Sequence, residues 1–223
     1  MKHSLAGKAL TRYAAGLLAA GLLIFLPAGT LKFPRGWLFL GVLFLPMLVM
    51  GLVMLKKAPD LLRRRLESKE QEQTQRLVVA LSALMFLAGF VLCGLDFRFD
   101  WLQLPHWISW AAAAVFLIGY GMYAEVMREN SYLSRTVKVE AEQTVIDTGL
   151  YGIIRHPMYT ATVLMFVTIP LVLGSLAALP VFLIYPVIIV LRIRNEEQVL
   201  KAELKGYAEY CTRVTYRLLP KIW

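Results

Sequence analysis

Six long apolar runs constrain the fold of this 223-residue chain more than any other feature of its sequence. Most are roughly 17–21 residues long and almost uncharged, about the length that a helix needs to cross a bilayer. The composition agrees, because 58% of the residues are hydrophobic, more than soluble domains carry. We therefore predict an all-α polytopic membrane bundle of about six transmembrane helices, followed by a C-terminal cytosolic helix and tail. The predicted runs are residues 10–30, 37–55, 77–95, 107–127, 158–174 and 176–191.

The distribution of basic residues predicts the orientation. Of the 24 Lys and Arg residues, 21 fall in the N-terminal segment, the 56–76 connector, the 128–157 loop and the part from residue 192 onward, and three fall on the other side. Cytoplasmic loops of membrane proteins are enriched in Lys and Arg. Both termini and the polar stretches that could carry chemistry are therefore expected on the cytoplasmic face. The net charge of +9 points to membrane lipid as a contact, and not to nucleic acid.

The chain divides into two parts. Residues 1–127 hold four spans and the basic connector 56–76, which we expect to be solvated and partly helical. Residues 128–223 hold a long polar loop, an apolar helical hairpin, a charged helix over 192–212 and an extended basic tail. The first run resembles a signal peptide in part, but no clear cleavage site follows it, so a membrane span is expected there. The two cysteines form no motif, and no histidine spacing predicts a metal site.

Polar and aromatic residues gather at residues 149–159, at the edge of the fifth run. Proline is favoured at the first position of a helix, so Pro157 is expected to open the apolar helix. Arg155 and His156 would then lie beside the positive end of the helix dipole, a combination that attracts an anion. The simpler alternative is a helix start with a basic flank at a membrane surface.

The tight hairpin predicts that the start of the fifth span lies beside the end of the sixth. This arrangement would bring two acids, several arginines, a histidine and tyrosines together at the membrane edge, as a zwitterionic ligand requires. Glu196 and Glu197 are about 100° apart on a helix, so at most one is expected to face a given pocket. Arg192 and Glu196 are spaced for a local ion pair. A belt of charged side chains at the membrane surface is the alternative interpretation.

The order of motifs over residues 128–223 resembles the isoprenylcysteine carboxyl methyltransferases and the related phospholipid methyltransferases. The resemblance rests on Gly149-x-Tyr151-x-x-x-Arg155-His156-Pro157-x-Tyr159, then Glu196-Glu197, then Gly206-Tyr207-x-x-Tyr210 and a closing Arg217-Leu218-x-Pro220. It implies an integral-membrane enzyme that uses S-adenosyl-L-methionine, bound without a Rossmann domain, and a lipophilic acceptor. The first four spans share only their apolar character with the family.

The resemblance also implies roles for individual residues. His156 and Tyr159, with Pro157 between them, would contact the cofactor, and Tyr151 and Gly149 would shape the approach. Arg155 would support an anionic group, and one of Glu196 and Glu197 would meet the cofactor's ammonium. Gln143 stands where the carboxyl methyltransferases have a histidine; it can hydrogen-bond adenine or ribose but cannot act as a base. The predicted catalytic residues are Arg155, Glu196 and Arg192.

The sequence leaves alternatives open for both the methyl acceptor and the enzyme class. An isoprenylcysteine-type carboxylate, a phospholipid amine and other amphiphiles all fit, with Arg192, Arg194 or Arg213 as candidates to hold an acidic head. Membrane reductases of the sterol-reductase type, which use NADPH, share a similar Arg-His-Pro-x-Tyr stretch. They usually follow it with Gly and an acid, whereas Ala161 and Thr162 occupy those positions here. A scaffold or transport protein without chemistry would place charges along the spans, and almost none occur there.

Overall fold

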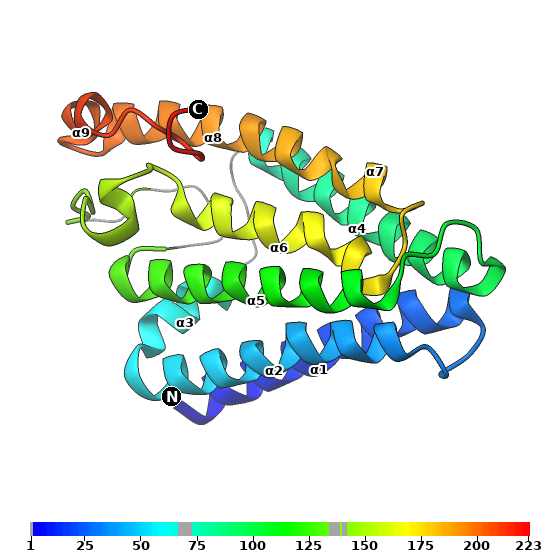
Figure 1. Cartoon of the computed structure of the whole chain (residues 1–223). Helices are drawn as coiled ribbons and strands as arrows, with labels where there is room; N and C mark the ends of the chain where they lie inside the picture. Colours follow the sequence, from blue (N-terminus) through cyan, green and yellow to red (C-terminus); the bar gives the residue numbers. More distant parts are fainter. Residues whose placement is uncertain (1, 67–72, 134–138, 140–141) are drawn as a thin grey trace.

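The computed structural model describes residues 2–66, 73–133, 139 and 142–223, and its regular elements are all helical (Figure 1). The long helices run roughly along one direction and pack side by side. This arrangement confirms the predicted all-α bundle. The elements are α1 (Lys2–Ala28), α2 (Pro34–Lys57), α3 (Pro59–Leu66), α4 (Gln73–Phe99), α5 (His106–Glu129), the 3₁₀ turn η1 (Gly149–Gly152), α6 (Pro157–Leu173), α7 (Leu179–Phe182), α8 (Ile184–Glu203) and α9 (Tyr207–Arg213).

Four of the described helices, α1, α2, α4 and α5, are long and apolar enough to cross a membrane. They correspond to the first four predicted runs. Helix α6 is also apolar but has only 17 residues. The four long helices, together with the apolar α6, define an integral membrane protein.

The sixth run differs from its prediction, because it is not one continuous helix. Its first part forms the short helix α7, and α8 begins after Leu183. Helix α8 then continues without a break from the apolar part into the polar part and ends at Glu203. The predicted polar helix over 192–212 is therefore divided, and the division falls at Gly206, whose φ of +84° is unfavourable for other residues. One rigid helix thus carries Arg192 and Glu196 out of the membrane-embedded part.

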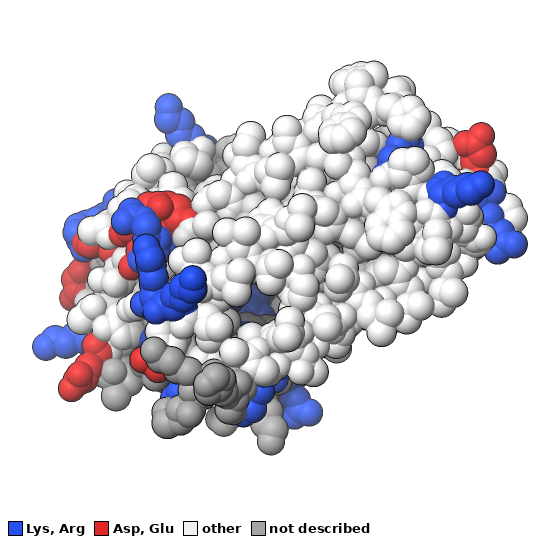
Figure 2. All heavy atoms as spheres, turned by 90° about the horizontal axis from the view of Figure 1, so that it is seen from below, with Lys and Arg blue, Asp and Glu red and all other residues white. Residues whose placement is uncertain are grey.

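Charged side chains gather at the two ends of the bundle, with an apolar surface between them on the face shown in Figure 2. More of them lie at the end where α3 and α9 are found, and both ends of the chain lie there too (Figure 1). The predicted placement of the termini on one side is therefore consistent with the arrangement of the helices.

The connector 56–76 is less solvated than predicted. Helix α3 confirms its partly helical character, but Leu61 and Leu62 are buried in a small apolar cluster with Leu5, Met54 and Met127. The remaining predicted connector residues 67–72, and residues 134–138 and 140–141 of the 128–157 loop, lie outside the described part of the chain. The proposed division into residues 1–127 and 128–223 stays a prediction.

Close contact between α5 and α6 fixes the position of the helix that carries the site. A Cβ atom added to Gly119 of α5 would lie 2.9 Å from Cγ of Met165 and 3.1 Å from the carbonyl oxygen of Ala161. The absence of a side chain at Gly119 therefore lets the two helices approach each other. On the other side of α6, Phe86 of α4 contacts the rings of Phe166 and Tyr185 edge-on or tilted.

Candidate cofactor site at one end of the bundle

The turn before α6 depends on a glycine. Gly149 begins η1 with a φ of +55°, and a Cβ atom there would lie 3.2 Å from the carboxylate carbon of Glu129. Any larger residue would strain the backbone and crowd Glu129. Helix α6 then begins at Pro157, as predicted from the sequence, with His156 immediately before it.

The C-terminal tail holds this helix start in place through the backbone. The N–H of Arg155 donates to the carbonyl of Tyr216, and the N–H of His156 donates to the carbonyl of Arg217, both at 2.9 Å. The hydroxyl of Thr160 donates to the carbonyl of Leu218 at 2.8 Å. Tail carbonyls therefore occupy the backbone donors just before α6, so these donors do not face a ligand.

The anion predicted beside Arg155 and His156 proves to be an internal carboxylate. Glu197 is buried and accepts from Nε of Arg155 at 2.8 Å and from Nε of Arg217 at 3.0 Å; its Oε1 also lies 3.2 Å from Nε2 of His156. Burial raises the pKa of Glu197, but the hydrogen bonds from His156 and Arg217 and the charges of His156 and Arg155 outweigh it and lower the pKa to about 2. Glu197 therefore stays ionised and fastens α8 to the start of α6 and to the tail.

Arg155 also fastens the end of α9. Its Nη1 donates to the carbonyl oxygens of Val214 at 2.8 Å, Thr215 at 3.2 Å and Cys211 at 3.3 Å. The last carbonyls of a helix lack partners within the helix, and a guanidinium nearby satisfies them. The donors of this buried guanidinium are thus largely directed at the protein itself.

Two consecutive side-chain hydrogen bonds link α6 to α8. Nε of Arg192 donates to the hydroxyl of Tyr159 at 2.7 Å, and that hydroxyl donates to Glu196. The Tyr159 ring lies nearly parallel to that of His156, with centroids 5.7 Å apart. Arg192 and Glu196, which the sequence predicts to share a helix face, are therefore bridged by a phenol from the neighbouring helix.

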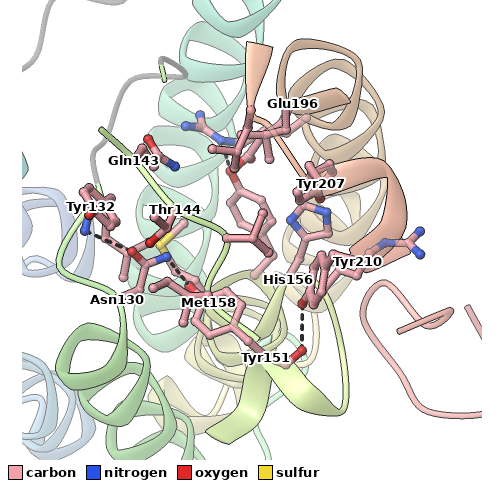
Figure 3. A pocket seen from close by; sticks show the side chains of 18 residues that line it. Asn130, Tyr132, Gln143, Thr144, Tyr151, His156, Met158, Glu196, Tyr207 and Tyr210 are labelled. Atoms are coloured by element: carbon pink, nitrogen blue, oxygen red, sulfur yellow. Dashed lines mark hydrogen bonds between the residues drawn. The ribbon is translucent and has the colours of Figure 1, made fainter. Parts of the chain in front are cut away.

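These groups form one wall of a cavity at the charged end of the bundle, shown in Figure 3. Of the predicted site residues, seven line it: Gln143, Tyr151, Arg155, His156, Tyr159, Arg192 and Glu196. Three predicted site residues do not line the cavity, namely Gly149, Pro157 and Glu197. They shape or fix the elements that form its walls. Of the two adjacent acids, Glu196 faces the cavity, and Glu197 is held in ion pairs. Among the arginines suggested for an acidic head, Arg213 pairs with Asp147 on the surface at 2.9 Å.

Several lining residues were not predicted. Asn130, Tyr132 and Thr144 come from the loop between α5 and η1, and Tyr207 and Tyr210 come from α9. The hydroxyl of Tyr210 donates to the Tyr151 carbonyl at 2.7 Å, and Asn130 donates to the Tyr151 hydroxyl at 3.0 Å. The spacing Tyr207-x-x-Tyr210 places both rings on one helix face and could have indicated a wall. The loop residues carry no comparable pattern.

Comparisons with known proteins agree with this arrangement. Residues 107–205 match the model of the phospholipid methyltransferase family. The fold is similar to that of a solved eukaryotic intramembrane Ras methyltransferase, isoprenylcysteine carboxyl methyltransferase, with a TM-score of 0.57 and 18% identity over 96% of this chain and 77% of that one. The predicted resemblance to membrane methyltransferases is therefore confirmed by the family match over residues 107–205, and the similarity of fold extends along almost the whole chain.

One relative belongs to the sterol reductases, the alternative enzyme class considered from the sequence. The chain is 31% identical over 91 residues to the Delta(14)-sterol reductase TM7SF2 of Mus musculus. That match covers 40% of this chain and 22% of the reductase. The two classes therefore share a segment, and the family match favours the methyltransferase.

Proposed function

We propose that this protein is an integral-membrane methyltransferase that takes S-adenosyl-L-methionine as its methyl donor and a lipophilic molecule as its acceptor. The observation that carries the proposal is the cavity itself. It combines a carboxylate, Glu196, with aromatic rings and hydrogen-bonding side chains, at the end of a bundle whose family match is to phospholipid methyltransferases.

The chemistry of the lining residues fits this methyl donor, which carries an ammonium, a carboxylate, a sulfonium and an adenosine. Glu196 would bind the ammonium, and the ring of Tyr159 offers a face that attracts a cation. Gln143 and Asn130 would hydrogen-bond the polar edges of the adenosine. When bound, the cofactor supplies an activated methyl group, and its transfer requires mainly that donor and acceptor are close and aligned.

Arg192 and Glu196 are the residues that we place nearest the chemistry. Arg192 would attract an acidic acceptor, and a carboxylate acceptor needs no base. An amine acceptor must lose a proton, for which Glu196 is the carboxylate that lines the cavity. Arg155 is better placed to position the wall than to touch the acceptor, because its guanidinium bonds Glu197 and three carbonyls. An isoprenylcysteine-type carboxylate and other amphiphiles both remain candidates for the acceptor.

Ligand-induced stabilisation of the purified protein in detergent tests the cofactor. S-adenosylhomocysteine should raise the melting temperature, since a ligand at 100 times its Kd stabilises the folded state by about 2.7 kcal/mol. Glu196→Gln should weaken this shift, and Glu203→Gln, an exposed position on the same helix, should leave it intact. A shift with NADPH and none with S-adenosylhomocysteine would instead support the reductase class, which the similarity to the sterol reductase makes the second candidate.

A further inference from the structure

One polar group in the cavity wall is not used by any of the described residues. The hydroxyl of Tyr207 is buried and has no hydrogen-bond partner among the described residues. The residue is 5% exposed and lines the cavity. A buried hydroxyl without a partner costs on the order of 1–3 kcal/mol, so a protein rarely keeps one unless something else satisfies it.

Tyr210, three residues further along α9, provides the contrast. It lines the same cavity and is also buried, but its hydroxyl donates to the Tyr151 carbonyl at 2.7 Å. The rings of the two tyrosines lie 5.7 Å apart. One phenol on this face therefore serves the fold, and the other belongs to a residue that lines the cavity together with Glu196 and His156 (Figure 3).

The Tyr207 hydroxyl is held in its protonated form. Burial raises its pKa, and the negative charges of Glu197 and Glu196 raise it further. A protonated phenol can donate a hydrogen bond, so an acceptor group on a ligand in the cavity would satisfy it.

The surroundings decide which acceptor fits. An α-amino acid carries its ammonium and its carboxylate on one carbon, so a ligand whose ammonium meets Glu196 must place its carboxylate close by. Glu197 would repel the carboxylate of such a ligand, but its negative charge is offset by Arg155, His156 and Arg217, which all contact the Glu197 carboxylate. Arg155 itself lines the cavity and adds positive charge there.

We propose that the Tyr207 hydroxyl donates a hydrogen bond to the carboxylate of the amino-acid portion of the cofactor, opposite Glu196, which binds the ammonium of the same group. This inference rests on the proposed function. It makes Tyr207 a ligand-binding residue that selects the intact amino-acid portion of the methyl donor.

Tyr207→Phe removes only the hydroxyl and tests the inference by two readouts. The affinity for S-adenosylhomocysteine should fall roughly 10- to 100-fold, as expected for a lost hydrogen bond to a charged group. The affinity for decarboxylated S-adenosylhomocysteine, which keeps the ammonium but lacks the carboxylate, should be unchanged. The melting temperature without ligand should stay the same or rise, whereas Tyr210→Phe should lower it.

Each contrary result has a defined meaning. If the parent protein does not bind S-adenosylhomocysteine, the proposed function and this inference both fail. If the parent binds it and Tyr207→Phe binds it equally well, the inference alone fails. An equal loss of affinity for both ligands would place the hydroxyl against another part of the cofactor and overturn the carboxylate assignment. A melting temperature that falls as far as in Tyr210→Phe would show that the hydroxyl serves the fold.

Discussion

At the scale of the residue, two adjacent glutamates have opposite tasks. Glu197 is held by two arginines and a histidine, whereas Glu196 accepts from the Tyr159 hydroxyl and faces the cavity. Their positions one residue apart on α8 point them in different directions. A helix can therefore use one acid to hold its neighbours and the next to meet a ligand.

Replacement of Glu197 should destabilise the fold strongly. Glu197→Gln leaves Arg155 and Arg217 without their carboxylate, and the loss of one member of a buried ion pair costs about 3–5 kcal/mol. Thermal unfolding in detergent, without ligand, would measure the effect, with the exposed Glu203→Gln as the control. A melting temperature equal to that of the parent would contradict the structural task assigned to Glu197.

The same carboxylate predicts how stability depends on pH. Its folded-state pKa is lowered from 4.5 to about 2, so its contribution is fully present above about pH 4.5 and is lost as the pH falls toward 2. The difference in melting temperature between the parent and Glu197→Gln should therefore narrow as the pH decreases from 5 to 3. A difference that is constant over this range would show that the carboxylate carries no linked proton.

At the scale of the element, contacts from several other parts of the chain fix the position of the start of α6. The tail bonds the backbone just before it, and Glu197 of α8 bonds Arg155 and His156. Further along α6, α5 approaches the helix closely where Gly119 meets Ala161 and Met165. Helix α8 crosses the boundary between apolar and polar surroundings without a break. It therefore transmits the packing of the membrane-embedded part directly to Glu196.

Two glycines of α5 offer a matched test of this packing. Gly119→Leu would force α5 and α6 apart, because overfilling a packed contact costs typically 1–3 kcal/mol, and should lower both the melting temperature and the affinity for S-adenosylhomocysteine. Gly121→Leu should leave both nearly unchanged, since nothing lies within 4 Å of a Cβ atom there. Equal effects of the two substitutions would show that the close approach does not position the site.

At the scale of the whole molecule, the helices place most of the charge, both ends of the chain and the cavity at one end of the bundle (Figures 1 and 2). The distribution of Lys and Arg along the sequence predicts that this end faces the cytoplasm. A soluble cofactor and a lipophilic acceptor would then meet where the apolar helices emerge from the membrane.

Labelling of introduced cysteines in intact cells would test this orientation, since the native Cys93 is buried. In a background with Cys211→Ser, we expect Lys32→Cys to react with a membrane-impermeant maleimide and Lys201→Cys to react only after permeabilisation. Both lysines are exposed and lie at opposite ends of the bundle. The reverse pattern would place the cavity on the other side of the membrane.

The amino-acid sequence was enough to predict the helical class, the existence of the four long spans, three of them to within four residues at each end, and the start of α6 at Pro157. Hydrophobic length and a proline at a helix start are local properties, so they can be recognised without knowledge of distant contacts. The pattern of motifs also identified seven of the residues that line the cavity, and the family match supports the methyltransferase class.

The partners of each polar residue depend on the tertiary structure. Arg217 meets Glu197 from 20 positions away, Tyr210 meets Tyr151 from 59 positions away, and Tyr207 meets no partner among the described residues. The direction of Glu196 and Glu197, the break between α7 and α8 and the buried face of α3 likewise depend on packing between helices. Side-chain partners across such distances are set by the three-dimensional arrangement of the helices, which the residue order alone does not encode in any local pattern.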